Sequence, residues 1–122
     1  MPDPDKDAPS FSFAFTRSGV VVKHRQNVTP RAIEISFSRM NGWERRAIHF
    51  KAGDTVKFHF ECRLESGSLS VDLLAPDGST LIHWGDTPTA TSDFTAAAEG
   101  KYVVRATADH AAGAYRLEMG SA

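Results

Sequence analysis

Residues 55–64 read TVKFHFECRL, and apolar and polar side chains alternate along this whole stretch. Successive side chains of a β-strand point to opposite faces, so Val56, Phe58 and Phe60 share one face while lysine, histidine and glutamate share the other. A strand with this pattern packs one face against a hydrophobic core and exposes the other to water. The stretch therefore predicts a half-buried strand of an antiparallel sheet.

The same two-residue period recurs through most of the chain. It occurs in four further long segments and two short ones, namely 31–39, 68–75, 101–109, 114–119, 11–15 and 48–50. Strands that recur about every 8–12 residues are typical of sandwiches and barrels rather than of βαβ units. The sequence therefore predicts an all-β fold, an antiparallel two-sheet β-sandwich that is jelly-roll-like and has about seven to nine strands.

The breaks between these segments contain turn-forming residues. The strongest is 76–79, Pro-Asp-Gly-Ser, because proline presets φ near about −65° and Asp-Gly tolerates the positive φ of tight hairpins. Glycine also occurs in the breaks at 52–54, 65–67 and 110–113. We interpret 65–67 and 110–113 as hairpin turns, and the connection around 85–93 as a crossing between the two sheets.

The length and the first residues predict one domain with a short extension. A chain of 122 residues fits a single domain with one core. Residues 1–10, MPDPDKDAPS, contain no large apolar side chain except the initial methionine, so we expect a disordered N-terminal spacer followed by one β-sandwich domain over 11–122. Such a spacer is typical of bacterial proteins that work outside the cytoplasm, whether periplasmic, secreted or lipid-anchored; an ordinary frayed terminus is the alternative.

Charge and cysteine content exclude several function classes. With 14 basic and 15 acidic residues the net charge is −1, which argues against nucleic acid as a partner. The one adjacent basic pair, Arg45 and Arg46, is interpreted as solvated charges at a strand end. No apolar run approaches the ~20 residues of a membrane-spanning helix. The single cysteine, Cys62, rules out an internal disulfide, and its phase with Phe58 and Phe60 predicts a small buried hydrophobe.

Two segments resemble known families of β-sandwich domains. Residues 50–81, FKAGDTVKFHFECRLESGSLSVDLLAPDGSTL, resemble the central part of GOLD-type domains. Residues 99–119, EGKYVVRATADHAAGAYRLEM, are similar to the closing hairpin of bacterial pre-peptidase C-terminal domains, in which a Gly-x-Tyr strand precedes Gly-x-Tyr-x-Leu. The resemblance implies a jelly-roll-like sandwich and an appended recognition or anchoring role. The matched residues are structural in both families, so no active site is implied.

Histidine supplies the best candidates for a metal site. His49 and His59 flank the 52–54 break, and both are in the outward phase of their strands. If those strands pair as a hairpin, the two rings share one exposed face, and Glu61 lies on the same face as His59. Two histidines and a carboxylate are able to bind zinc. Exposed strands also carry histidine routinely, and the spacing matches no metal signature, so we expect no metal and no cofactor.

No residue pattern indicates catalysis. No serine lies in a Gly-x-Ser-x-Gly elbow, which a serine hydrolase of the α/β type requires. Asp54 and Asp77 are explained as turn formers, and Asp72 lies mid-strand in the outward phase. We therefore predict that the protein is not an enzyme, with a small hydrolase or metal-binding protein as a remaining alternative.

Aromatic residues give the best lead to a ligand. Trp43 follows Asn-Gly, and Trp84 is followed by Gly85 and Asp86, so both tryptophans are placed at strand ends or loops. With His83 they form a candidate site that would stack on a sugar or grip a peptide. The other interpretation, which we favour, is that both rings plug the ends of the sandwich. We predict a non-catalytic binding or protein-interaction module with a protein or carbohydrate ligand; a carbohydrate-binding module that uses these tryptophans is the alternative.

Overall fold

The computed structural model describes residues 9–85 and 89–121, and every strand pairing in them is antiparallel. These residues form six strands and no helix. The strands are β1 (Phe11–Thr29), β2 (Ala32–Phe50), β3 (Thr55–Leu74), β4 (Thr80–Trp84), β5 (Thr89–Thr95) and β6 (Gly100–Ser121). The all-β antiparallel fold predicted from the two-residue period is therefore confirmed. No helix long and apolar enough to cross a membrane occurs in this part of the chain.

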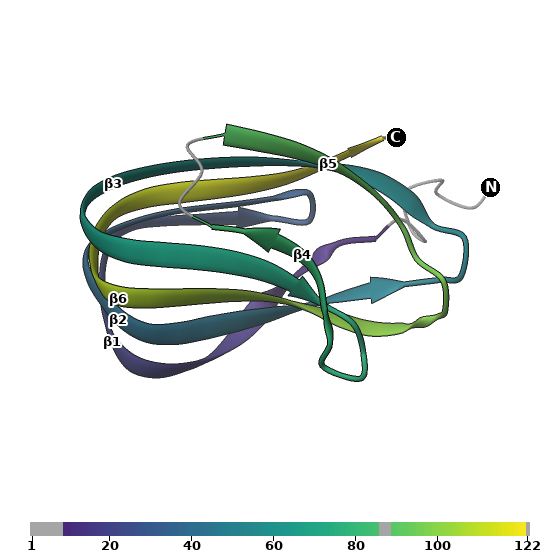
Figure 1. The fold of residues 1–122 in the computed structure, drawn as a ribbon, viewed down its shortest axis with the longest axis horizontal. Helices are drawn as coiled ribbons and strands as arrows, with labels where there is room; N and C mark the ends of the chain where they lie inside the picture. The colour runs from purple at the N-terminus through teal and green to yellow at the C-terminus, as the bar shows by residue number, and fades with distance from the viewer. Residues whose placement is uncertain (1–8, 86–88, 122) are drawn as a thin grey trace.

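The sheet is a strip of long strands that turns back on itself. The strand order is β1-β2-β6-β3-β4, and β5 pairs with β3 on the same side as β4. The four long strands have 19 to 22 residues, whereas strands of globular proteins usually have about 3–10. Figure 1 shows all four turning over at one end of the molecule, so that the two halves of each strand lie in two facing layers.

The register defines the two layers of this β-sandwich. Layer A consists of β4 and the strand halves that pair around it, namely 68–74, 100–109, 42–50 and 11–18. Layer B consists of β5 and the halves 55–64, 113–121, 32–40 and 20–29. The predicted two-sheet, jelly-roll-like sandwich is thus confirmed. Each long strand contributes to both layers, which is why the sequence shows more alternating segments than there are continuous strands.

The hairpin interpretation of 65–67 and 110–113 is wrong. β3 continues through the first and β6 through the second, and the two strands pair with each other on both sides of these points. The register shifts near Ser66, as it does in β2 between Phe37 and Gly42, so these are bulges at which the strands bend.

Glycine permits the bend because backbones approach closely there. Gly42 pairs with Gly19 of β1 and has a φ of +134°, and a Cβ on Gly42 would lie 2.0 Å from the carbonyl oxygen of Ser18. No other residue type fits at that distance, so the glycine is required by the path of the backbone.

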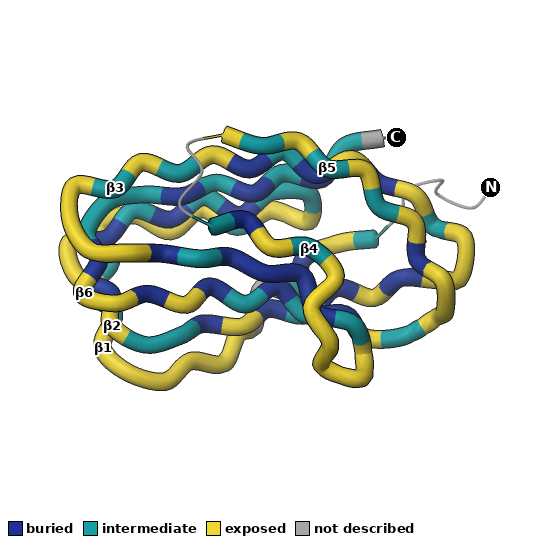
Figure 2. Tube along the Cα trace, viewed as in Figure 1, coloured by how far each residue is buried: buried dark blue, intermediate teal, exposed yellow. Residues whose placement is uncertain are grey.

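The core lies between the layers and consists of the inward half of each alternating segment. Figure 2 shows that buried and exposed residues alternate along the strands. The largest fully buried side chains are Phe50, Phe58, Phe60, Ile33, Ile35, Met40, Ile48, Leu73, Leu117, Val56 and Val71. Phe58 and Phe60, which predicted the first strand, are both 0% exposed. The inward face of residues 55–64 was therefore identified correctly.

A buried ion pair interrupts the apolar core beside β1. Glu44 and Arg46 are each 3% exposed, because they share the inward phase of β2 with Ile48. Lys23 approaches Glu44 at 2.9 Å, and the Phe15 ring lies 4.2 Å from the Lys23 ammonium and 4.6 Å from the Arg46 guanidinium. The interpretation of Arg46 as a solvated charge is wrong, since strand phase places it inside.

The start of the described chain is attached to the domain. The Pro9 carbonyl accepts a hydrogen bond of 2.9 Å from Arg31, and Phe11 donates its backbone N–H to the Pro30 carbonyl. Residues 1–8 of the predicted 1–10 spacer lie outside the described residues. The division into a spacer and one domain over 11–122 stays a prediction.

Candidate functional site

A groove of about 960 Å³ opens on layer B beside the bend of the long strands. Its lining comes from β2, β3, β5 and β6. The lining residues are Glu34, Glu61, Cys62, Arg63, Leu64, Gly67, Thr89, Ala114, Tyr115 and Arg116. Four of the ten carry a charge, and the two signs are equally represented, so the groove offers hydrogen-bond donors and acceptors together.

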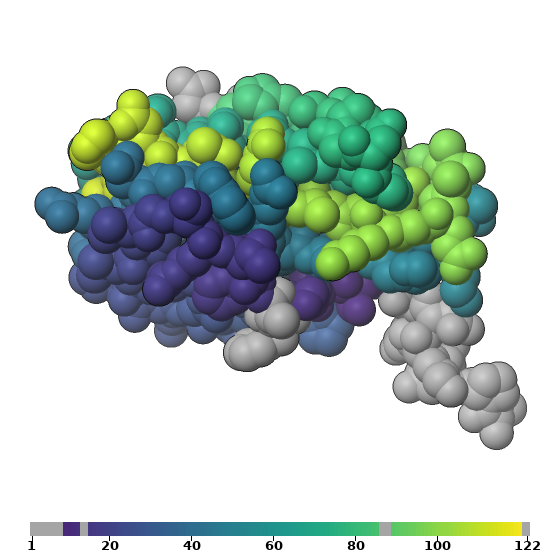
Figure 3. All heavy atoms as spheres, turned by 90° about the horizontal axis from the view of Figure 1, so that it is seen from below, coloured from purple at the N-terminus to yellow at the C-terminus, as the bar shows by residue number. Residues whose placement is uncertain are grey.

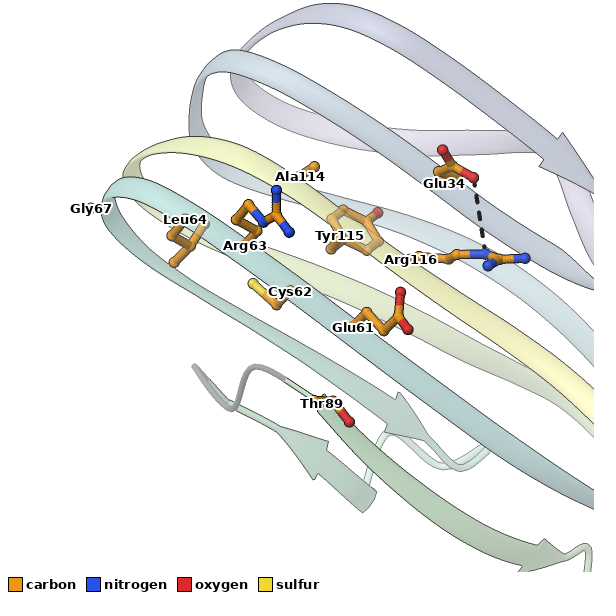
Figure 4. A pocket seen from close by; sticks show the side chains of 10 residues that line it. All are labelled: Glu34, Glu61, Cys62, Arg63, Leu64, Gly67, Thr89, Ala114, Tyr115 and Arg116. Atoms are coloured by element: carbon orange, nitrogen blue, oxygen red, sulfur yellow. Dashed lines mark ion pairs between the residues drawn. The ribbon is translucent and has the colours of Figure 1, made fainter.

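Cross-strand register brings the charged residues together. Glu34 of β2, Arg116 of β6 and Glu61 of β3 lie opposite one another on three neighbouring strands. The Arg116 guanidinium lies 3.9 Å from Glu34, an ion pair drawn as a dashed line in Figure 4. It lies 2.6 Å from Glu118. These side chains are in the outward phase of layer B, so they project from the sandwich rather than into its core.

A small side chain makes room in the groove. Arg63 of β3 pairs with Ala114 of β6, and the methyl group of Ala114 fills little of the space between its larger neighbours. Figure 4 shows Arg63 and Ala114 at one end of the group and Glu34 with Arg116 at the other. The space above Ala114 is therefore bordered by guanidinium groups that donate and carboxylates that accept hydrogen bonds.

The groove also reaches inward-facing residues at the margin of β3. Thr89, the first residue of β5, pairs with Glu61, and pairing between these two strands ends there. Beyond that point Cys62 and Leu64, which pack partly buried against the core, line the groove. The inward phase predicted for Cys62 is confirmed, but its burial is intermediate rather than complete. The groove thus combines a charged rim with an apolar side.

Tyr115 lies at this apolar side and stays neutral. It is 4% exposed, and burial raises the pKa of its phenol far above the ordinary value of 10.0. The negative charge of Glu44 raises this pKa further, and the positive charge of Arg46 lowers it. Tyr115 therefore contributes a rigid ring to the groove and no acid–base chemistry near neutral pH.

The predicted histidine pair does not form. His59 is on the outer face of layer B, where its ring nitrogens lie 3.0 Å from Glu61 and 3.2 Å from Thr91. His49 is on the outer face of layer A and pairs with Glu99 at 3.4 Å. The expected hairpin between their strands is absent because β6 lies between β2 and β3. Within the described residues no group of three or more His, Cys, Asp or Glu side chains is arranged to hold a metal ion.

The two tryptophans belong to different environments. Trp84 is 2% exposed and stacks on Phe60 with ring centroids 5.9 Å apart, and its Nε1 donates to Ser92 at 3.3 Å. The candidate ligand role of Trp84 is therefore wrong, and the interpretation that its ring plugs the sandwich is confirmed for this tryptophan, which packs between β4 and β5. Trp43 is partly exposed on the outer face of layer A, with the Arg45 guanidinium 4.6 Å from its ring.

His83 is also apart from the groove. Its Nδ1 contacts the carboxylate of Asp72, the opposite residue on β3, and Arg105 contacts the other oxygen of that carboxylate at 3.3 Å. The side chains of His83 and Arg105 cover Asp72, which is 5% exposed although its phase is outward, as predicted. Asp86, the fourth member of the predicted ligand site, lies outside the described residues.

Of the four charged residues at the rim of the groove, the sequence analysis singled out only Glu61 as a candidate site residue. It missed Glu34, Arg63 and Arg116. Each of these belongs to the polar half of an alternating segment, and many other polar residues have the same local pattern. Only the pairing of β2 with β6 and of β6 with β3 brings the three together. Local sequence contains no signal for that pairing.

Comparison with known proteins finds chains of similar structure but none of similar sequence. No protein-family model and no curated protein matches the sequence. A CBM4 structure is similar with a TM-score of 0.44 and 11% identity, over 80% of this chain and 74% of that one. The CBM22-1 xylan-binding domain of Paenibacillus barcinonensis Xyn10C gives 0.40 and 10%, over 96% and 88%.

A third similar structure is the enzymatically active domain of tailspike protein 4 from bacteriophage CBA120. It gives a TM-score of 0.47 and 8% identity, and the match spans 89% of this chain but only 18% of that one. At such identities a likeness concerns the path of the backbone and not the residues of a site. Function is therefore inferred from the chain's own residues, and kinship with GOLD-type or pre-peptidase C-terminal domains stays a prediction.

Proposed function

We propose that this chain is a non-catalytic binding module whose ligand lies in the groove between Glu34, Glu61, Arg63 and Arg116. The observation that carries the proposal is the groove itself, since about 960 Å³ lies within the range of about 300–1,000 Å³ in which small-molecule sites fall. Its rim residues are mounted on three paired strands, and sites on strands are held more precisely than sites on loops.

The lining favours a saccharide as ligand. A saccharide hydroxyl both donates and accepts hydrogen bonds, and the groove presents carboxylates that accept beside guanidinium groups that donate. The apolar side formed by Cys62 and Leu64 suits the C–H faces of a sugar ring. Arg116 already engages the carboxylates of Glu34 and Glu118, so these acids act as fixed hydrogen-bonding groups and not as a reactive pair.

Calorimetry with a panel of neutral oligosaccharides tests the proposal. We expect a member of the panel to bind, and Arg63→Gln and Glu34→Gln each to weaken its binding about tenfold or more, because each removes a charge-assisted hydrogen bond. Lys57→Gln is the matched control, since Lys57 is an exposed charge on the same strand that does not line the groove. Binding that survives both groove variants unchanged would place the ligand elsewhere.

The only cysteine supplies an independent readout of the same groove. Cys62 lines the groove at intermediate exposure, so a bound saccharide is expected to slow its alkylation in the native protein. Lys57→Gln should leave this protection intact, and Glu34→Gln should reduce it. An alkylation rate that is the same with and without saturating ligand would contradict occupancy of the groove.

A protein partner is a second candidate, favoured by the margin of β3. Its pairing with β5 ends at Glu61 and its pairing with β4 begins at Val71, so among the described residues 62–70 have β6 as their only strand partner. An exposed strand margin accepts an extended peptide by β-addition. Hydrogen exchange separates the two ligands, because an added strand protects backbone amides along the whole of 62–70, whereas a saccharide reaches only the residues that line the groove, which end at Gly67.

Function outside the bacterial cytoplasm, as the N-terminal composition predicts, is part of this proposal. Fractionation of the producing cells tests it directly. Recovery of the protein with cytoplasmic markers alone would contradict it.

A further inference from the structure

A second cavity lies on the outer face of layer A, on the opposite side of the sandwich from the groove. Its volume is about 330 Å³, and β1, β2 and β6 supply its lining. Three of its side chains are cationic, those of Arg45, Arg46 and Lys101, and hydroxyl groups come from Ser12 and Thr16. None of the residues that line it is acidic.

The register of layer A explains why a cavity forms at this place. Ala47 pairs with Val103, and these short side chains occupy the centre of the outward face. Arg45 is two residues to one side of Ala47, and Lys101 is two residues to the other side of Val103, so long basic side chains border short apolar ones. Between Phe11 and Phe15 the register of β1 shifts, which interrupts regular pairing beside the cavity.

The cationic groups differ in how far they are already neutralised. Arg46 is buried and bonds Glu44 at 3.4 Å. Arg45 and Lys101, by contrast, are exposed and form no ion pair with a carboxylate of the described residues. Arg45 also lies directly opposite Arg105, whose guanidinium contacts the carboxylate of Asp72 at 3.3 Å, so Arg105 has a counter-charge and Arg45 has none among the carboxylates of the described residues. An anion beside Arg45 would supply that counter-charge.

The charge distribution of the whole chain points the same way. Residues 11–50, which form β1 and β2, contain seven arginine or lysine residues and two glutamates, although the net charge of the chain is −1. Figure 3 shows β1, in purple, at one margin of the molecule and the later strands, in green, away from it. Of these seven basic residues, Arg17, Arg45 and Arg46 lie in the strand halves of layer A, and together with Lys101 they make the surroundings of this cavity positive, which attracts anions.

We propose that this cavity is a binding site for an oxyanion, either a phosphate or sulfate group or a carboxylate. The planar guanidinium of Arg45 binds two oxygens at once, the Lys101 ammonium binds a third as a point charge, and the Thr16 hydroxyl donates to the same group. The site is independent of the saccharide groove, because the two lie on opposite outer faces. It gives the module a second, charge-selective contact.

Titration followed by backbone NMR shifts tests this proposal, with inorganic phosphate, sulfate and glucuronate as probes and glucose as the uncharged control. We expect oxyanions to shift the amides around Ala47 and Val103 and glucose to leave them unchanged. Arg45→Gln and Lys101→Gln should each raise the Kd about tenfold or more, the usual loss when a charge-assisted hydrogen bond is removed. Arg39→Gln, an exposed arginine of β2 outside the cavity, should leave the Kd unchanged.

Each outcome of the titration either supports or overturns the proposed oxyanion site. Selective binding of glucuronate identifies an acidic saccharide as the source of the oxyanion, and selective binding of phosphate or sulfate identifies an ester of those acids. Binding weakened equally by Arg39→Gln and Arg45→Gln would mean diffuse attraction to a basic surface and would overturn the site. So would the absence of shifts around Ala47 with every oxyanion. Circular dichroism of the variants confirms that these exposed substitutions leave the fold intact.

Discussion

Replacing Gly42 with alanine tests the bent-strand architecture at its closest approach. The φ of +134° at Gly42 is one that residues with a side chain rarely adopt. An added Cβ would lie 2.0 Å from the Ser18 carbonyl oxygen and 2.9 Å from the Gly19 Cα. Both are backbone atoms, so no side-chain rotation relieves the contact, and β1 and β2 must separate at the bend.

The expected cost has two parts. Forcing a non-glycine residue into such a sparsely populated positive φ costs about 1–3 kcal/mol. Moving β1 away also disrupts cross-strand hydrogen bonds, each with a net value of about 1 kcal/mol, so we expect Gly42→Ala to lose about 3–5 kcal/mol in total. That is a large part of the roughly 5–15 kcal/mol by which a domain is stable.

Gly53→Ala provides the matched control. Gly53 has a φ of +88°, but an added Cβ there meets nothing within 4 Å, so only the backbone part of the cost applies. Urea unfolding followed by fluorescence measures both variants, and we expect Gly42→Ala to lose at least about 2 kcal/mol more of the unfolding free energy than Gly53→Ala. Equal losses in the two variants would refute the close crossing of β1 and β2 at the bend.

Three further predictions concern the interior. Because the folded-state pKa of Tyr115 is raised, the unfolded chain releases the phenol proton first, so the stabilisation from this group is complete below pH 10.0 and declines above it. Alkaline unfolding curves of a Tyr102→Phe variant, in which Tyr115 is the one remaining tyrosine, check this, and tyrosinate absorbance of that variant at pH 10 without unfolding would contradict it. Glu44→Gln should cost about 3–5 kcal/mol in denaturant unfolding, because buried Arg46 loses its counter-charge, and a loss below about 1 kcal/mol would show that the pair is solvated. Iodide should quench the fluorescence of Trp43 and not that of Trp84, so Trp43→Phe should leave an emission that iodide does not reduce.

The fold class was predictable because it depends on local pattern. Alternation over ten residues at 55–64 has one simple physical explanation, a strand with one buried face. The buried residues Val56, Phe58 and Phe60 follow directly from it. The same reasoning failed for Arg46, whose charge suggested solvent although its phase with Ile48 and Phe50 indicated the interior. Phase was the better guide, because a strand cannot turn one side chain outward without a bulge.

The candidate site was hardly predictable, because it depends on which strands become neighbours. Glu34, Glu61 and Arg116 are far apart in sequence and meet only because β6 lies between β2 and β3. The opposite assumption, that β2 and β3 pair across the 52–54 break, brought His49 and His59 together in error. The long-range pairing of β6 with β2 and with β3 leaves no trace in the composition of any single segment.

The bends, by contrast, did leave a signal in the sequence, which is a change of phase. In β3 the inward residues have even numbers from Val56 to Leu64 and odd numbers from Leu69 to Leu73. A hairpin turn places no constraint on the phase of the strand that follows it. A continuous strand whose inner face stays inside around a bend must gain one residue to change phase, and that is the definition of a bulge. The phase change at 65–67 therefore fits the register shift at Ser66.

The same bends determine where the two proposed sites lie. Because β2 passes through the bend, its outward residues before the bend lie on the outer surface of layer B. Those after the bend lie on the outer surface of layer A. Glu34 and Arg45 are thus eleven positions apart on one strand yet on opposite outer faces of the molecule. A rolled sheet of long strands gives a small domain two outer faces with different charge, one mixed around Arg116 and one basic around Lys101. The two proposed ligand sites therefore need no second domain.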